Sequence, residues 1–190
     1  MNLETLRDAL PSYAKDLRLN LGSVLADVLG MTKPQQWGTA LAVAIATRNP
    51  LVQQAIAAEA AAHLSAAENE AARIAAAIMA MNNIYYRSLH LLENETYLKT
   101  PAGLRMNAMA QHTASKVDFE LWALAVSAVN GCGMCIQSHQ KKLVSEGVSD
   151  DVIRQAFRIA AVLQAVAVTL EAEAHMPANN SQVPAAEQVA

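Results

Sequence analysis

Residues 65–87 read SAAENEAARIAAAIMAMNNIYYR, a stretch dominated by residues that favour helices. Ser65, followed three positions later by Glu68, forms a capping box, the pattern with which many helices begin. No glycine or proline interrupts the stretch. We therefore expect one long helix that begins after Ser65 and runs to about Arg87.

The composition of the 190-residue chain extends this expectation to an all-α fold with a single core. Hydrophobic residues make up 53% of the chain and aromatic residues 4%, and 7 glycines and 6 prolines are few for a turn-rich sheet protein. The length suits one domain. A net charge of −3 without runs of like charge provides no basic surface, so nucleic-acid binding is not expected.

The sequence predicts neither a membrane span nor a secretory leader. The apolar windows 75–81 and 159–170 fall short of the roughly 18 residues that a spanning helix needs. The first eight residues include the acidic Glu4 and Asp8 and lack the apolar stretch of a secretory signal. We therefore expect a cytoplasmic protein that does not bind a membrane.

Several helix boundaries can be predicted from capping residues and glycines. We expect a helix after the pair Asn49-Pro50, three helices in the second half, and a domain that spans residues 1–175. The tail, residues 176–190, has no periodic apolar face, and we expect it to be mobile. The boundaries in the second half are set by Ser115, Asn130-Gly131, Gly147 and Ser149.

A weak internal repeat relates the two halves at an offset of 85 residues, which pairs Trp37 with Trp122. It predicts a degenerate repeat at about 30–90 and a catalytic repeat at about 115–175. Residues able to carry chemistry occur only in the second copy. The pairs are Gln35 with Glu120, Thr47 with Cys132, Pro50 with Cys135, and Gln54 with His139.

Cys132 and Cys135 are the only cysteines, and they lie three positions apart. In a reducing compartment a cross-link over so short a loop stabilises little, so redox chemistry explains the pair better than structure does. The repeat places Cys135 near a helix start, where the helix dipole lowers a thiol pKa. His139 follows one turn later on the same face and could take a proton from Cys135.

Glu120 completes a possible proton relay. If the chain turns at Asn130-Gly131 and two helices run antiparallel, the heights of Glu120 and His139 along the helices differ by only about 4–5 Å. The carboxylate would then orient the imidazole, and the imidazole would exchange a proton with Cys135. Since only Cys135 has a local base, we expect it to attack the substrate, although Cys132 would attack if the pair followed the thioredoxin order.

Two alternative roles for the cysteines remain open. A zinc site would need both cysteines, His139 and one distant histidine, which could be His63, His90 or His112. Two inert buried cysteines in a structural module are the second alternative. The methionines are expected to serve packing or subunit contacts; they include Met79, Met81, Met106, Met109 and Met134.

These motifs resemble the alkyl hydroperoxide reductase D (AhpD) family of the carboxymuconolactone decarboxylase-like superfamily, over most of residues 1–175. The most specific likeness is Phe119-Glu120-Leu121-Trp122 followed by Asn130-Gly131-Cys132, Cys135 and His139. Further matching stretches are Pro11-Ser12-Tyr13-Ala14-Lys15-Asp16, Gln36-Trp37-Gly38-Thr39, Ala46-Thr47-Arg48-Asn49-Pro50, Met79-Ala80-Met81-Asn82-Asn83 and Gly103-Leu104-Arg105-Met106-Asn107.

The resemblance implies a helical homotrimer that acts as an antioxidant thiol peroxidase on organic hydroperoxides. It implies that Cys135 becomes a sulfenic acid, that Cys132 resolves it to a disulfide, and that Glu120 and His139 relay protons. It also implies a dihydrolipoyl group on an acyltransferase as the reductant and the peroxiredoxin AhpC as a partner, with no bound flavin, haem or metal. A decarboxylase activity of the wider superfamily is the alternative, but it gives the cysteine pair no role.

One residue departs from the family pattern. Better-known members carry a histidine immediately before the second cysteine, and this chain has Met134 there. A thioether cannot exchange protons near neutral pH. We therefore expect slower peroxidase turnover, or a water molecule between His139 and Cys135, whereas dithiol exchange needs mainly the cysteine pair.

Overall fold

The computed structural model describes residues 1–26 and 30–176, and within these residues it is all-helical, without a strand. This confirms the predicted fold class. The tail predicted to be mobile lies, from residue 177 on, outside the described residues. The helices are α1 (Leu3–Asp8), the 3₁₀ helix η1 (Ser12–Ala14), α2 (Lys15–Val24), α3 (Lys33–Thr47), α4 (Pro50–Ala60), α5 (Ala66–Leu92), α6 (Glu95–Lys99), α7 (Ala108–Gln111), α8 (Lys116–Val129), α9 (Gly133–Ser145) and α10 (Asp150–His175).

The helices begin at the predicted caps. Ser65 and Glu68 form the expected capping box at the start of α5, which runs to Leu92, five residues beyond the predicted end. Asn49 caps α4, whose first residue is Pro50. Ser115 and Ser149 cap α8 and α10 in the same way, because each side chain accepts a hydrogen bond from the first turn.

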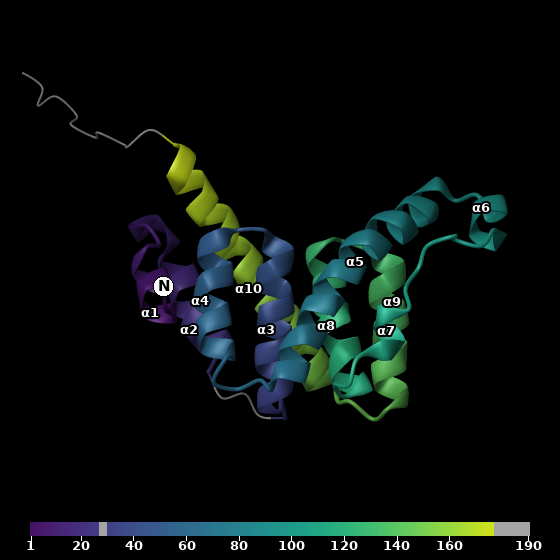
Figure 1. The fold of residues 1–190 in the computed structure, drawn as a ribbon. Coiled ribbons are helices and arrows are strands. Elements are labelled where there is room, and N and C mark those ends of the chain that lie inside the picture. Colours follow the sequence, from purple (N-terminus) through teal and green to yellow (C-terminus); the bar gives the residue numbers. More distant parts are fainter. Residues whose placement is uncertain (27–29, 177–190) are drawn as a thin grey trace, which may run out of the picture.

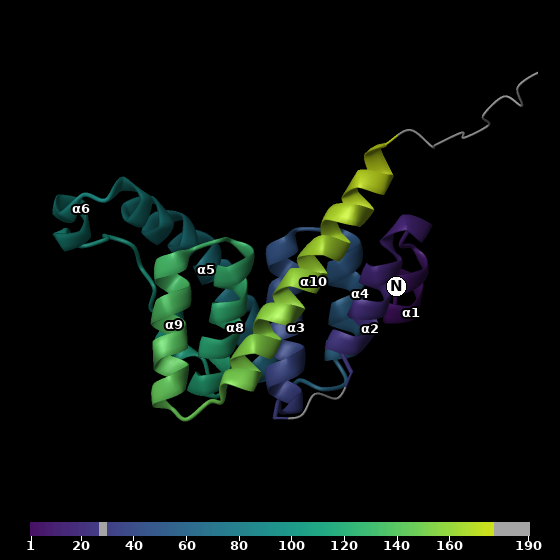
Figure 2. The same cartoon turned by 180° about the vertical axis from the view of Figure 1, so that it is seen from behind.

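Helices α3 and α8 pack against each other at the centre, and α5 and α10 each contact both (Figure 1). Trp122 of α8 is fully buried and lies against Gly38 of α3. A Cβ atom at Gly38 would lie 2.3 Å from Cε2 of Trp122, so only glycine permits this close approach. Helices α1, α2 and α4 lie on one side of the central pair, and α9 lies on the other (Figure 2).

Three helices recur in the same order in both halves of the chain. Helices α3, α4 and α5 begin at residues 33, 50 and 66, and α8, α9 and α10 begin at residues 116, 133 and 150, so that each start recurs 83 or 84 residues later. A duplicated unit would produce this order, but the duplication itself stays a prediction.

The last third of α5, residues 84–92, and α6 form an arm that projects from the other helices in both views (Figures 1 and 2). Large apolar side chains are exposed along it. They are Ile84, Leu91, Leu92, Tyr97 and Leu98. The arm therefore presents apolar surface that nothing covers within the described part of the chain.

Helix α10 is long and apolar enough, by length and composition alone, to cross a membrane, and it is the one such helix in the described residues. In its most apolar window, 50% of the residues are buried. These buried residues, among them Ile159, Leu163 and Val166, belong to the hydrophobic core, and α10 contacts α2, α3 and α8. The core helix of a globular bundle meets the same criteria.

Candidate active site

The turn between α8 and α9 positions the two cysteines. Helix α8 ends at Val129, and Gly131 follows with a φ of 66°, in the left-handed region that favours glycine. The backbone N–H of Cys132 then donates to the carbonyl oxygen of Ser127 at 3.0 Å, which closes the turn. As predicted, the chain reverses at Asn130-Gly131, and α8 and α9 pack side by side (Figure 2).

Both cysteines are free thiols at the start of α9. Cys132 is the N-cap residue, and its Sγ accepts a hydrogen bond from the backbone N–H of Cys135 at 3.3 Å. The two differ in access, because Cys132 is fully buried whereas Cys135 is 7% exposed and lines a cavity. A substrate in that cavity meets Cys135 first.

The cavity beside Cys135 has a volume of about 360 Å³, enough for a small organic molecule. It reaches the surface at Ser138, which is exposed. Its wall is mainly apolar and rich in methionine. Met79 and Met109 belong to the hydrophobic core or pack against it, as expected, and they also line this cavity. The lining residues are Met79, Asn82, Tyr86, Met106, Met109, Met134, Cys135, Ser138 and His139.

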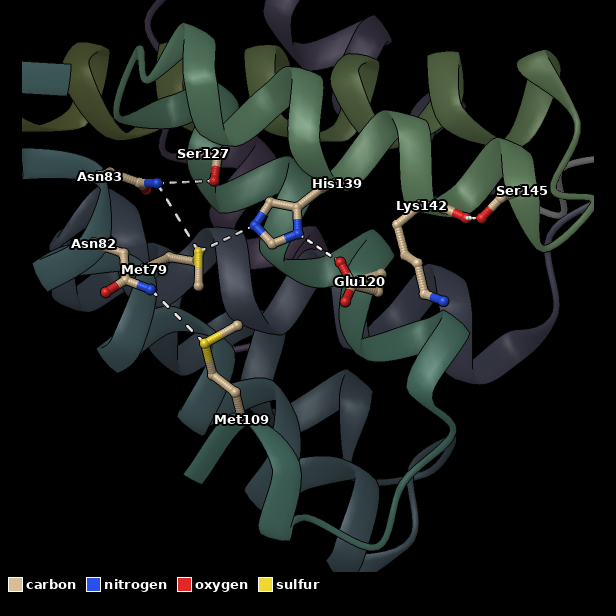
Figure 3. A network of polar contacts seen from close by, with 9 residues as sticks. All are labelled: Met79, Asn82, Asn83, Met109, Glu120, Ser127, His139, Lys142 and Ser145. Carbon is tan, nitrogen blue, oxygen red and sulfur yellow. Dashed lines mark hydrogen bonds and ion pairs between the residues drawn. The ribbon is translucent and has the colours of Figure 1, made fainter. Parts of the chain in front are cut away.

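Glu120 and His139 meet as predicted. Oε2 of Glu120 lies 2.6 Å from Nδ1 of His139, a hydrogen bond between α8 and α9 (Figure 3). The side chains are 25% and 10% exposed, respectively, so solvent screens this pair less than a surface pair. The carboxylate fixes the orientation of the imidazole ring and leaves Nε2 for exchange with other groups.

Nε2 of His139 does not contact Cys135 in the way that the spacing suggested. The group that Nε2 contacts in the described structure is Sδ of Met79 on α5, at 3.4 Å (Figure 3). Met79 is almost fully buried, and it comes from a helix 60 positions earlier in the sequence. Proton exchange between His139 and Cys135 therefore needs either a shift of Met79 or a bridging water molecule.

Asn83 is a site residue that the sequence motifs did not single out. Its Nδ2 donates to Oγ of Ser127 at 2.9 Å, and its Oδ1 accepts from Nδ2 of Asn130 at 2.9 Å. These bonds tie α5 to the end of α8, directly before the cysteine turn; Figure 3 draws the bond to Ser127. The Asn83 amide also lowers the pKa of Cys135 by hydrogen bonding.

The net effect on Cys135 is nevertheless opposite to the expected one. The pKa of Cys135 is raised from 9.0 to about 12, chiefly by burial and then by the hydrogen bond with Cys132, and the Asn83 amide opposes both only in part. The expected depression of the Cys135 pKa is therefore wrong for the reduced protein. The thiol is protonated at neutral pH, so its reaction with a substrate needs a group that takes the proton.

The described residues contain no group of three or more histidine, cysteine or acidic side chains placed to hold a metal ion. The histidines considered as a fourth zinc ligand lie elsewhere. His63 stacks on Trp37 with ring centroids 4.9 Å apart, and His112 stacks on Phe119 at 4.2 Å. His90 is exposed near the end of α5, on the arm.

Comparisons with known proteins agree with the site. The model of the carboxymuconolactone decarboxylase family matches residues 95–175, which include both cysteines, Glu120 and His139. The alkyl hydroperoxide reductase AhpD of Frankia alni is 56% identical over 172 residues, which cover 90% of this chain and 92% of that protein. The alkyl hydroperoxide reductase AhpD of Rhodospirillum centenum is 56% identical over 175 residues, which cover 92% of this chain and 93% of that protein.

The likeness extends over nearly whole chains. The AhpD of Streptomyces coelicolor is 52% identical over 178 residues, which are 94% of this chain and 99% of that protein. Identity of this extent covers the fold and the cysteine turn together. The chain therefore belongs to the alkyl hydroperoxide reductase AhpD family, as the sequence motifs indicated.

Proposed function

We propose that this oxidoreductase reduces organic hydroperoxides through a dithiol–disulfide cycle of Cys132 and Cys135. The observation that carries the proposal is the difference between the two sulfurs. Cys135 lines an apolar cavity, and Cys132, held at the N-cap three residues earlier, is buried and in hydrogen-bond contact with Cys135. The name of these relatives, alkyl hydroperoxide reductase, supports the same substrate class.

The first step is attack by the Cys135 thiolate on the terminal oxygen of the hydroperoxide. The S–O bond forms while the O–O bond breaks, so Cys135 becomes a sulfenic acid and the alkoxide leaves and takes a proton to give the alcohol. The sulfur of Cys132 then attacks the sulfur of Cys135 and expels water. Over the two steps the cysteine pair loses two electrons, and the oxygens of the hydroperoxide gain them.

His139 is the group best placed to take the proton of Cys135. Its ring is oriented by Glu120 at 2.6 Å and also lines the cavity. Because Nε2 faces Met79, the proton crosses through a water molecule or after Met79 moves. Met134 lines the same cavity and cannot carry protons, so this route is the one available to the enzyme.

Mass spectrometry of single-cysteine variants tests the cycle. After one equivalent of organic hydroperoxide, the unsubstituted chain should lose two hydrogens within the peptide that holds Cys132 and Cys135. Cys135→Ser should consume no hydroperoxide, and Cys132→Ser should react once and keep a sulfenic acid on Cys135. A sulfenic acid on Cys132 in the Cys135→Ser variant, with none in the reverse variant, would show that the thioredoxin order holds.

We further propose a dihydrolipoyl group, carried by an acyltransferase, as the reductant of the disulfide and the peroxiredoxin AhpC as a partner. A dithiol donor suits a disulfide formed between neighbouring residues, because both electrons come from one molecule and a mixed disulfide resolves within it. Dihydrolipoamide should restore two free thiols under conditions in which thioredoxin alone does not. Equal rates with the two donors would refute the lipoyl assignment.

Finally, we propose that the chain assembles as a homotrimer through the exposed apolar face of the arm. Apolar patches of this kind often mark subunit contacts. Light scattering coupled to size-exclusion chromatography should give three times the chain mass. Replacing Leu91 and Leu92 together by serine should reduce that mass, whereas Val144→Ser, at an exposed apolar residue of α9, should not. A monomer in the unsubstituted chain would refute the assembly.

A further inference from the structure

Asn82 is buried with almost none of its hydrogen-bonding capacity used. Only 4% of its surface is exposed, and its Oδ1 has no hydrogen-bond partner. Its Nδ2 faces Sδ of Met109 at 3.7 Å (Figure 3), and a thioether is a weak acceptor. A primary amide can make four hydrogen bonds, so this side chain is buried at a free-energy cost that the fold does not recover.

Asn83, the next residue on the same helix, is a buried asparagine with a structural role. Asn83 is fully buried too, but its amide donates to Ser127 and accepts from Asn130, both at 2.9 Å. Asn82 and Asn83 thus differ in their hydrogen-bond partners, although both are buried asparagines on α5. Buried polar atoms without partners are rare in proteins, and each calls for a reason beyond packing.

The position of Asn82 supplies that reason. It lines the cavity that also holds Cys135 and His139, on a wall otherwise made mostly of methionine. Of the lining residues, Cys135 and His139 take part in the proposed chemistry and Ser138 lies at the exposed edge. The half-buried Tyr86 also lines the cavity, but Oδ1 of Asn82 is the one buried polar atom of the lining residues that lacks a hydrogen-bond partner. A few polar groups in a mainly apolar pocket are the arrangement by which pockets orient a ligand.

We propose that Asn82 binds the peroxide group of the substrate and aligns it with Cys135. This inference rests on the proposed function. A hydroperoxide R–O–O–H carries one O–H donor and two oxygen acceptors, which complement the two ends of an amide. Oδ1 is shielded from the cavity in the free protein, so the amide turns about its Cβ–Cγ bond when the hydroperoxide binds. Oδ1 then accepts the hydrogen bond from the terminal O–H, and Nδ2, released from Met109, donates to the inner oxygen.

These contacts also favour the reaction. When the Cys135 thiolate attacks the terminal oxygen, the electron pair of the O–O bond moves to the inner oxygen, which leaves as an alkoxide before it is protonated. A donor on that oxygen binds it more strongly as negative charge develops. The apolar part of the hydroperoxide lies along the methionines, whose flexible side chains adapt to different shapes.

The test uses the Cys132→Ser chain, in which Cys135 reacts once. Cumene hydroperoxide is mixed with it in a stopped-flow instrument, and the second-order rate constant for sulfenic acid formation is measured. Asn82→Leu, which keeps the size but loses both hydrogen bonds, should lower this constant about tenfold to a hundredfold. Asn82→Ala serves as a second variant, and Asn69→Leu, on the same helix but outside the cavity, should leave it unchanged.

Alkylation of Cys135 by iodoacetamide separates substrate binding from a structural effect, because it needs the thiolate but no peroxide. Asn82→Leu should alkylate within about twofold of its parent. An equal loss in both reactions, or no loss in the peroxide reaction, would overturn the role of Asn82 while the cycle stands. If the parent with Asn82 intact fails to react with the hydroperoxide, the proposed function itself fails and the role of Asn82 with it.

Discussion

Asn83→Ala should both destabilise the protein and slow the alkylation of Cys135. The substitution takes two hydrogen bonds of 2.9 Å from the junction of α5, α8 and the cysteine turn. It leaves the fully buried Oγ of Ser127 and the partly buried amide of Asn130 without these partners. At about 1–3 kcal/mol for each buried group left unpaired, the free energy of unfolding should fall by about 2–4 kcal/mol.

Urea denaturation followed by circular dichroism measures this loss, and thermal unfolding should show a midpoint about 5–15 °C lower. Ser127→Ala is the matched control, because it removes one end of one bond and should cost less. The double variant should lose less free energy of unfolding than the two single variants lose in sum. The difference, above about 1 kcal/mol, is the coupling energy between Asn83 and Ser127.

The second measurement is the rate of Cys135 alkylation at pH 8 in the Cys132→Ser background. Because the Asn83 amide lowers the pKa of Cys135, its removal should reduce the thiolate fraction and slow alkylation. Faster alkylation in Asn83→Ala, or a stability change below about 0.5 kcal/mol, would refute this account of how α5 supports the cysteine turn.

Four more outcomes follow from the site. Since burial raises the pKa of Cys135 to about 12, its alkylation should accelerate about tenfold per pH unit from pH 7 to 10, and a plateau near pH 7 would contradict this. The pKa of Cys135 is higher in the folded than in the unfolded protein, which stabilises the fold below about pH 9, where the thiol is protonated in both states. Denaturation curves should therefore show the free energy of unfolding fall as the pH rises from 9 towards 12, because only the unfolded protein then loses the proton. Glu120→Gln should slow sulfenic acid formation about tenfold in stopped flow, because His139 loses its charged partner, with an unchanged circular dichroism spectrum as control. Met134→His should raise steady-state peroxidase turnover, and an unchanged rate would show that the proton route through His139 is sufficient.

The sequence predicted the parts of the fold that depend on local chemistry. Caps such as Ser65, Asn49 and Ser149 work within one turn of helix, so the starts of α4, α5 and α10 were predicted correctly. The meeting of Glu120 with His139 was also predictable, because one glycine turn and the helix rise fix their relative heights.

Contacts from α5 escaped the sequence analysis. Met79, Asn82 and Asn83 precede the cysteines by about 50 residues, and no spacing rule says which side of α5 faces α9. Met79 was therefore assigned to packing, although it holds Nε2 of His139. The error in the Cys135 pKa has the same origin, because the helix start is visible in the sequence but the burial that outweighs it depends on how α5, α8 and α9 pack.

In the proposed cycle the sulfur of Cys132 has two partners in turn. In the reduced protein it caps α9 by accepting from the backbone N–H of Cys135, whereas in the proposed disulfide it is bonded to the sulfur of that same residue. The reduced pair makes this hydrogen bond, so any part of it that is lost in the disulfide stabilises the dithiol relative to the disulfide. Each 1 kcal/mol of that difference raises the reduction potential of the couple by about 20 mV. The helix start thus favours return of the disulfide to the dithiol, the half of the cycle in which an external donor must supply the electrons.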